Sequence, residues 1–252
     1  MRLIPHEEHQ NSRSAISRIA TPRIDFEMAL AVRQLASRQA DKVKYLLEPE
    51  MTVLLSGFTD LRRRMFFDLL WNTGARLSEA LALSPEDTTL AVRWPLRPKV
   101  TLFTLKQQGK RGRPPKNAVR DIPLFDEGFA LRLRDHLDTF CRAKTKRIWP
   151  ESDDTMRNWL HHAVVRCEAE GFRFSVPVTP HTLRHSFGMH LLYCGVAPLT
   201  LQALMGHKDF KSTQIYLKTL ALEADVSGQY NVRFGMDKGE AEALLRRSVQ
   251  ST

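Results

Sequence analysis

The sequence predicts a mainly α protein with a small antiparallel β-sheet, and two patterns indicate this. Through most of the 252 residues, apolar side chains recur every three or four positions, as they do along one face of a helix. Residues 99–105 (KVTLFTL) and 118–124 (AVRDIPL) differ, because they are rich in strand-forming residues and flank a stretch loaded with Gly and Pro. We therefore expect one pair of antiparallel strands in an otherwise helical chain.

The first part of the chain predicts an arm followed by a helix. Residues 1–22 are polar and without pattern, which indicates a mobile arm. Apolar residues then recur at helical spacing from Ile24, and a polar stretch runs on to Lys44. Residues 45–51 (YLLEPEM) mark a junction, since the letters EPE are typical of the first turn of a new helix.

The following helices carry stop signals. Residues 60–72 hold an apolar stripe, and Gly74 follows as a C-terminal stop. The helical pattern restarts over residues 76–83 (RLSEALAL) and ends at Ser84-Pro85. The predicted helices that follow the strands cover residues 129–140, 156–167, 181–194, 198–205, 212–222 and 238–247.

The stretch between the two strands predicts a long hairpin tip. Residues 107–117 (QQGKRGRPPKN) combine Gly, Pro and positive charge. Such a segment is unable to pack into a core, so it is free to contact an anionic partner.

Composition and charge narrow the class of protein. Lys and Arg number 38 against 28 Asp and Glu, a net charge of +10 that favours a polyanionic partner such as nucleic acid, although many basic proteins merely have a high pI. Cys141, Cys167 and Cys194 are far apart and lack zinc-ligand spacing, which argues against a disulfide scaffold or zinc module. The sequence shows no membrane span and no secretion signal, so we expect a cytoplasmic protein with no membrane partner.

Three stretches carry candidate chemistry: residues 73–83 (TGARLSEALAL), 180–192 (PHTLRHSFGMHLL) and 204–218 (LMGHKDFKSTQIYLK). In this order they resemble the tyrosine recombinases, the phage-integrase and Xer family, over about residues 45–222. The resemblance implies the tyrosine recombinase catalytic-domain fold. It also implies cleavage of a DNA strand by a tyrosine, which leaves a 3′-phosphotyrosyl link and a free 5′-hydroxyl without a metal or nucleotide cofactor.

The same resemblance assigns the catalytic residues by motif. Arg76 stands in T-G-x-R-x-S-E, His181 and Arg184 in H-x-x-R, His207 in the G-H pair, and Tyr216 at the nucleophile. Two guanidinium groups can clamp the charge that develops on a phosphodiester. A tyrosine with a pKa of about 10 needs a base or an arginine field to ionise. His181 could accept its proton, and His207 could donate to a nonbridging oxygen.

A lysine of the hairpin is implied as the general acid that protonates the leaving 5′-oxygen. Lys106 is favoured because it ends the first strand, where the family's lysine stands, while Lys110 and Lys116 lie further along the tip. The alternative is that all three only contact backbone phosphates. The residues predicted to bind DNA outside the catalytic centre are Lys110, Arg111, Arg113, Lys116 and Arg120.

Simpler interpretations of single residues stay open. Arg76 could form a surface ion pair with Glu79, and Tyr216 could be an ordinary core residue. His181 and His185 stand four apart on one helix face as a possible metal pair. No Glu follows His181 in the H-E-x-x-H order, and we expect His185 to pack or cap.

The resemblance also predicts how the chain is organised. We expect residues 1–45 to form a short N-terminal arm and helix, in which the family's core-binding domain is reduced or absent, and residues 46–252 to form the catalytic domain. Residues 238–247 are expected to dock on a neighbouring protomer in a homotetramer on double-stranded DNA, or else to pack on their own domain. The short front end predicts weaker intrinsic affinity for DNA, an accessory DNA-bending or helper protein, or dependence on protein–protein contacts.

These observations predict a site-specific DNA recombinase, and resolution of plasmid or replicon multimers is the favoured role. A DNA invertase of the same family, a topoisomerase-like enzyme and a catalytically inactive DNA-binding regulator are the alternatives. The joint presence of all five motif residues argues against the inactive regulator.

Overall fold

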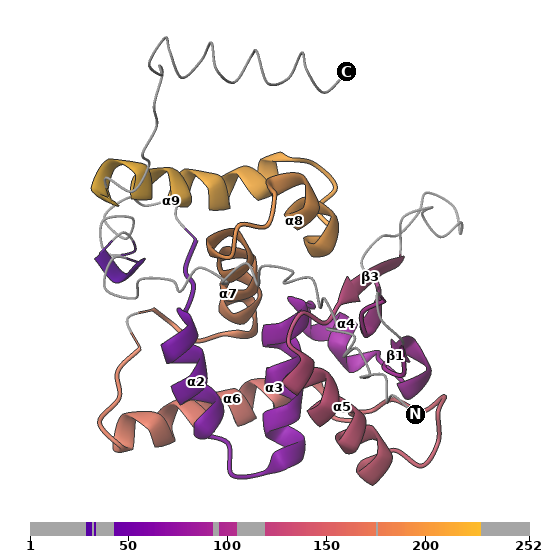
Figure 1. The fold of residues 1–252 in the computed structure, drawn as a ribbon. Coiled ribbons are helices and arrows are strands. Elements are labelled where there is room, and N and C mark those ends of the chain that lie inside the picture. Colours follow the sequence, from indigo (N-terminus) through magenta and orange to yellow (C-terminus); the bar gives the residue numbers. More distant parts are fainter. Residues whose placement is uncertain are drawn as a thin grey trace, which may run out of the picture.

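The computed structural model describes residues 29–31, 33, 43–92, 96–104, 119–174 and 176–227. Within these ranges the chain is mainly helical with one small antiparallel sheet, as the sequence predicted (Figure 1). The predicted arm, the hairpin tip and the helix over residues 238–247 lie outside the described residues. The helices are α2 (Glu48–Ser56), α3 (Leu61–Thr73), α4 (Leu77–Leu81), η1 (Pro85–Asp87, a 3₁₀ turn), α5 (Glu127–Phe140), α6 (Asp153–Ala169), α7 (Pro180–Tyr193), α8 (Pro198–Met205) and α9 (Lys211–Ser227).

Helix α3 is buried along most of its length and packs against α2, α5 and α7 (Figure 1). Asp60 caps its start by accepting a hydrogen bond from the backbone N–H of Arg63 at 2.9 Å. Gly74 ends it in the left-handed conformation, with φ 59°. A Cβ at Gly74 would lie 2.2 Å from Cδ1 of Phe187 on α7. Glycine therefore allows the turn that leads to Arg76 to lie directly against α7.

The sheet has the order β1-β2-β3, with β1 at Thr88–Thr89, β2 at Lys99–Phe103 and β3 at Val119–Pro123. Strands β2 and β3 confirm the predicted antiparallel pair. Strand β1 was not predicted, because two residues are too short to show a period. Leu102 pairs with Arg120 and Val100 with Ile122. Since Val100, Leu102 and Ile122 are fully buried, Arg120 shares the inward face of the sheet.

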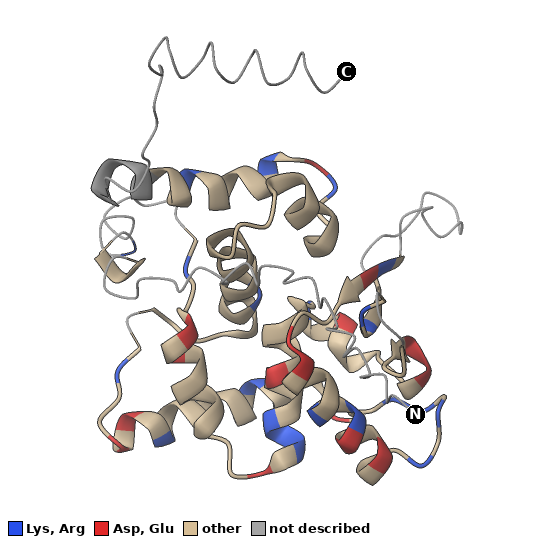
Figure 2. Ribbon diagram, viewed as in Figure 1, with Lys and Arg blue, Asp and Glu red and all other residues tan. Residues whose placement is uncertain are grey.

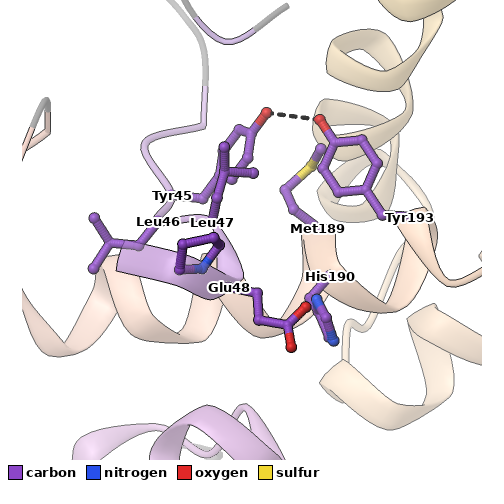
Figure 3. Close-up of a pocket in the computed structure, with 8 residues that line it drawn as sticks. Tyr45, Leu46, Leu47, Glu48, Met189, His190 and Tyr193 are labelled. Carbon is purple, nitrogen blue, oxygen red and sulfur yellow. Dashed lines mark hydrogen bonds between the residues drawn. The ribbon is translucent and has the colours of Figure 1, made fainter. Parts of the chain in front are cut away.

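The segment before α2 is fixed to the end of α7 (Figure 3). The hydroxyls of Tyr45 and Tyr193 lie 3.0 Å apart, beside a cavity of about 60 Å³. Arg33, from the helix predicted near the N-terminus, is buried at the same junction. It forms an ion pair with Glu50 of α2, with Nη2 and Oε1 3.0 Å apart, and donates a hydrogen bond to the Tyr45 carbonyl at 3.1 Å. Residue 33 is thereby tied to the start of α2.

Charges of both signs are spread over the described part of the chain (Figure 2). Arg62, Arg63 and Arg64 begin α3, at the end of the molecule away from α9 (Figures 1 and 2). Cys141, Cys167 and Cys194 form no disulfide with one another. No helix among the described residues is long and apolar enough to cross a membrane.

Candidate active site

Helix α7 presents the first group of candidate residues. Thr179 caps its start, where the Thr179 side chain accepts a hydrogen bond from a backbone N–H of the first turn. The helical period then places His181, Arg184 and His185 on one side of the helix. The three differ in exposure: Arg184 is buried, His185 is partly buried and His181 is exposed.

Arg184 connects two turns that are distant in sequence. Its Nη1 donates a hydrogen bond to the Gly74 carbonyl after α3 at 2.6 Å, and its Nη2 donates to the Met205 carbonyl at the end of α8. Burial lowers the pKa of Arg184 to about 10, and the nearby charges of Arg76 and Arg120 act in the same direction. The guanidinium therefore stays charged at neutral pH and holds the ends of α3 and α8 together.

Glu79 joins Arg76 to the sheet. Its buried carboxylate accepts hydrogen bonds from Arg76 Nη1 and from Arg120 Nη2, both at 2.7 Å. Arg120 also donates from Nε to the Leu204 carbonyl at 3.0 Å. Burial alone would raise the pKa of Glu79, but the hydrogen bonds and charges of Arg120 and Arg76 outweigh it and lower that pKa to about 2. The ion pair considered from the sequence is therefore present, and its carboxylate also connects β3 to α4.

We expect Glu79→Gln to lower the stability of the fold at neutral pH and to flatten its pH dependence. The pKa of Glu79 falls from 4.5 to about 2 on folding, so its carboxylate stabilises the fold above about pH 4.5 and loses this effect as the pH falls towards 2. A shift of this size corresponds to on the order of 3 kcal/mol at neutral pH.

The free energy of unfolding in urea at pH 7 and pH 3 measures this effect. The free energy of unfolding of wild type should fall more between pH 7 and pH 3 than that of Glu79→Gln. Asp121→Asn is the matched control, because Asp121 lies on β3 next to Arg120 but pairs with Lys99 on the exposed face. Equal losses in wild type and Glu79→Gln would contradict the assigned ion-pair network.

Tyr216 of α9 lies against α7 of the same chain. Its side chain is 1% exposed, and a Cβ at Gly188 would lie 2.9 Å from Tyr216 Cε1, so any larger residue there would displace the ring. The Tyr216 hydroxyl lies 2.8 Å from Nδ1 of His185. Burial raises the pKa of Tyr216 to about 12, against the opposing charges of Arg184 and Arg76. The phenol is therefore protonated at neutral pH and lies within the field of both arginines.

The His207 ring lies beside the Tyr216 ring. It follows Gly206, which ends α8 in the left-handed conformation with φ 61°. The two rings are nearly parallel, at 19°, with centroids 6.0 Å apart, and His207 Nδ1 lies 2.9 Å from Oγ1 of Thr213. Burial, with three nearby arginines, lowers the pKa of His207 to about 4. A neutral His207 can donate one hydrogen bond from a ring N–H.

An open cavity of about 410 Å³ connects this site to solvent. It lies between α7, α9 and residues 43–44 and 177–179, and both His181 and His185 line it. The His181 ring stands edge-on to the His185 ring, with centroids 4.7 Å apart. Burial and the charges of Arg184 and Arg76 lower the pKa of His181.

The structure thus places five of the predicted catalytic residues around one end of α7: Arg76, His181, Arg184, His207 and Tyr216. The other predicted residues lie mostly outside the described part of the chain: Lys106, Lys110, Arg111, Arg113 and Lys116. Their roles stay predictions. Arg120 is described, and its guanidinium is engaged by Glu79 and Leu204. Contact between Arg120 and DNA also stays a prediction.

His185 and Glu79 make contacts at the site that were not predicted from the sequence. We expected His185 to pack or cap, whereas its Nδ1 contacts the Tyr216 hydroxyl. The available signal was its position one turn after His181, on the face that carries Arg184. Glu79 was considered only as a surface partner, although its position one turn after Arg76 would also fit a buried one. No group of three or more His, Cys, Asp or Glu side chains in the described ranges could hold a metal ion.

Comparison with known proteins adds to this geometry. Residues 39–222 match the phage integrase family. A "Resolvase" from Escherichia coli is 42% identical over 241 residues, which cover 88% of this chain and 91% of the relative. A "Probable site-specific recombinase in afa region" from Escherichia coli is 40% identical over 238 residues, covering 94% and 95%. The crystal structure of XerA recombinase shares the fold with a TM-score of 0.58, at 20% identity over 77% of this chain and 66% of that one.

Proposed function

This chain belongs to the phage integrase family and is a tyrosine-type site-specific DNA recombinase, and on that premise we propose that Tyr216 is its nucleophile. One observation carries the assignment: the Tyr216 ring lies against α7 of its own chain, where its hydroxyl contacts His185 and the charges of Arg184 and Arg76 act on it. Attack by Tyr216 on a DNA phosphodiester would form a 3′-phosphotyrosyl bond and release a 5′-hydroxyl. Rejoining reverses these steps, so the bond energy is conserved.

We propose that Arg76 and Arg184 hold the scissile phosphate. A guanidinium carries five N–H donors, of which Arg184 uses one each at Gly74 and Met205, so others remain for phosphate oxygens. Arg76 keeps about a third of its side chain exposed (34%) beside the buried Glu79. His207 is proposed to donate to a nonbridging oxygen. Lys106 is proposed as the general acid for the leaving 5′-oxygen.

The proposed biological role is the resolution of plasmid or replicon multimers. The relative called "Resolvase" supports it, because the identity of 42% spans almost the full length of both proteins. DNA inversion is the alternative, since the same chemistry inverts or resolves according to the orientation of the two sites. We further propose a homotetramer on two double-stranded sites, with an accessory DNA-bending or helper protein. In this assembly residues 1–45 are the short N-terminal arm and helix expected from the sequence, residues 46–252 form the catalytic domain, and residues 238–247 bridge protomers.

Footprinting on DNA that flanks the coding sequence, followed by plasmid assays, tests the role. One plasmid carries two footprinted sites as direct repeats, and a second carries them as inverted repeats. We expect conversion of the direct-repeat plasmid into two circles. Inversion without resolution would favour the invertase. Relaxation of supercoils without exchange of strands would favour the topoisomerase-like alternative.

A further inference from the structure

The hydroxyl of Tyr216 is held by a histidine outside the motif positions. His185 Nδ1 lies 2.8 Å from Tyr216 Oη, and the two rings have centroids 5.6 Å apart. Gly188, nearly one turn after His185 on α7, lies directly against the Tyr216 ring. His181 contacts the His185 ring. The arrangement therefore places His185 next to the atom that must lose a proton before or during attack.

The surroundings of His185 favour its neutral form. His181 and Arg184 face it from α7, His207 from the turn before α9, and Tyr216 from α9 itself. Burial, together with the charges of His181, Arg184 and His207, lowers the pKa of His185 to about 4. A neutral His185 with an unprotonated Nδ1 can accept a hydrogen bond from the Tyr216 hydroxyl, and this is the tautomer that the proton transfer requires. His185 Nε2 then carries the ring proton.

A bound phosphate would favour transfer of the proton from Tyr216 to His185. Its negative charge would offset the positive charge of Arg184. The pKa of His185 would then rise, which favours the imidazolium. The cavity of about 410 Å³ that His185 lines with His181 and Lys44 offers water to which the imidazolium can pass a proton. His185 therefore meets two conditions for a general base. It contacts the hydroxyl whose proton it would accept, and it lines a cavity through which that proton could leave.

We propose that His185, and not the motif residue His181, is the catalytic residue that accepts the Tyr216 proton. The inference rests on the proposed role of Tyr216 as nucleophile. In cleavage the Oη–phosphorus bond forms, the proton of Oη passes to His185 Nδ1, the phosphorus–O5′ bond breaks, and the 5′-oxygen takes a proton from the general acid. In rejoining the 5′-hydroxyl attacks and returns its proton to the general acid, the phosphorus–Oη bond breaks, and His185 protonates Tyr216 with the proton that it kept or regained from the cavity water.

Proton-detected NMR of the histidine ring nitrogens tests the contact without DNA. Wild type at neutral pH should show His185 with an unprotonated Nδ1 whose resonance shifts in Tyr216→Phe. A proton on Nδ1 would overturn the proposal, because that nitrogen could not accept the phenolic proton.

Cleavage of a nicked duplex carrying the footprinted site tests the proton transfer. His185→Asn keeps a polar atom near Nδ1 but cannot take a proton, so adduct formation should slow by about 100-fold or more. His190→Asn, a half-buried histidine of the same helix that lies against Trp71, is the matched control and should cleave normally. Fluorinated tyrosine at position 216, which ionises more readily, should restore at least about tenfold to His185→Asn and change wild type little.

The outcomes distinguish failure of the proposed role of His185 from failure of the proposed role of Tyr216. A rate for His185→Asn within about threefold of wild type would overturn the proposal, as would a slow His185→Asn that fluorinated tyrosine fails to rescue. Rescue of His181→Asn, and not of His185→Asn, would assign the base to His181. Failure of wild type to form any adduct would instead overturn the proposed function of Tyr216.

Discussion

Tyr216→Phe is expected to bind its recombination site with near-normal affinity and to form no covalent adduct. The substitution keeps the ring that packs on Gly188 and removes only the hydroxyl that would become esterified to DNA. A phenylalanine side chain has no atom that can attack phosphorus, so no covalent adduct should be detectable. Trapping on a nicked duplex, with a gel assay for the adduct, measures the result.

Tyr193→Phe is the matched control for this experiment. Tyr193 is at the end of α7, where its hydroxyl lies 3.0 Å from that of Tyr45 at the junction with α2 (Figure 3). The variant removes a hydroxyl from the same class of side chain at another position, so it should form the adduct at the wild-type rate. A normal adduct from Tyr216→Phe would remove Tyr216 from the mechanism. Mapping the linked peptide would then identify the true nucleophile.

The helices of the fold were predictable because their signals are local. The stripe over residues 60–72 and the stop at Gly74 correspond to α3 and its left-handed C-cap. The strand pair was visible from composition, and it corresponds to β2 and β3. Strand β1 could not be predicted from the sequence. Its two residues form a strand only because the edge of β2 is available to pair with them.

The site was predictable as a set of motifs but not as a set of contacts. The spacing of residues along α7 places His181, Arg184 and His185 on one face, yet it does not tell which histidine meets Tyr216. That depends on how α9 crosses α7, and the crossing depends on Gly188, which no periodic pattern singles out. The inward position of Arg120 likewise follows from the register of β2 with β3.

Arg184→Lys is expected to slow adduct formation by about 10²–10³ fold, the usual loss when one donor to a developing oxyanion is removed. In wild type the guanidinium donates to the Gly74 and Met205 carbonyls and still has N–H groups for a phosphate. A single ammonium cannot span both carbonyls and the phosphate. The charge of Arg184 also lowers the pKa of Tyr216, against the effect of burial, and it does so more than that of Arg76. If the ammonium of the variant lies further from the phenol, Tyr216 should ionise less readily.

Single-turnover cleavage and urea unfolding, measured on the same preparations, separate chemistry from folding. Arg166→Lys is the matched control, because Arg166 of α6 donates to the Gly57 carbonyl at 2.8 Å without being among the predicted site residues. Both variants should lose some stability, since each loses an arginine contact to a backbone carbonyl. Only Arg184→Lys should lose cleavage once the DNA is bound. If the two variants cleaved at similar rates, Arg184 would be a residue that joins α3 to α8 and not one that binds the phosphate.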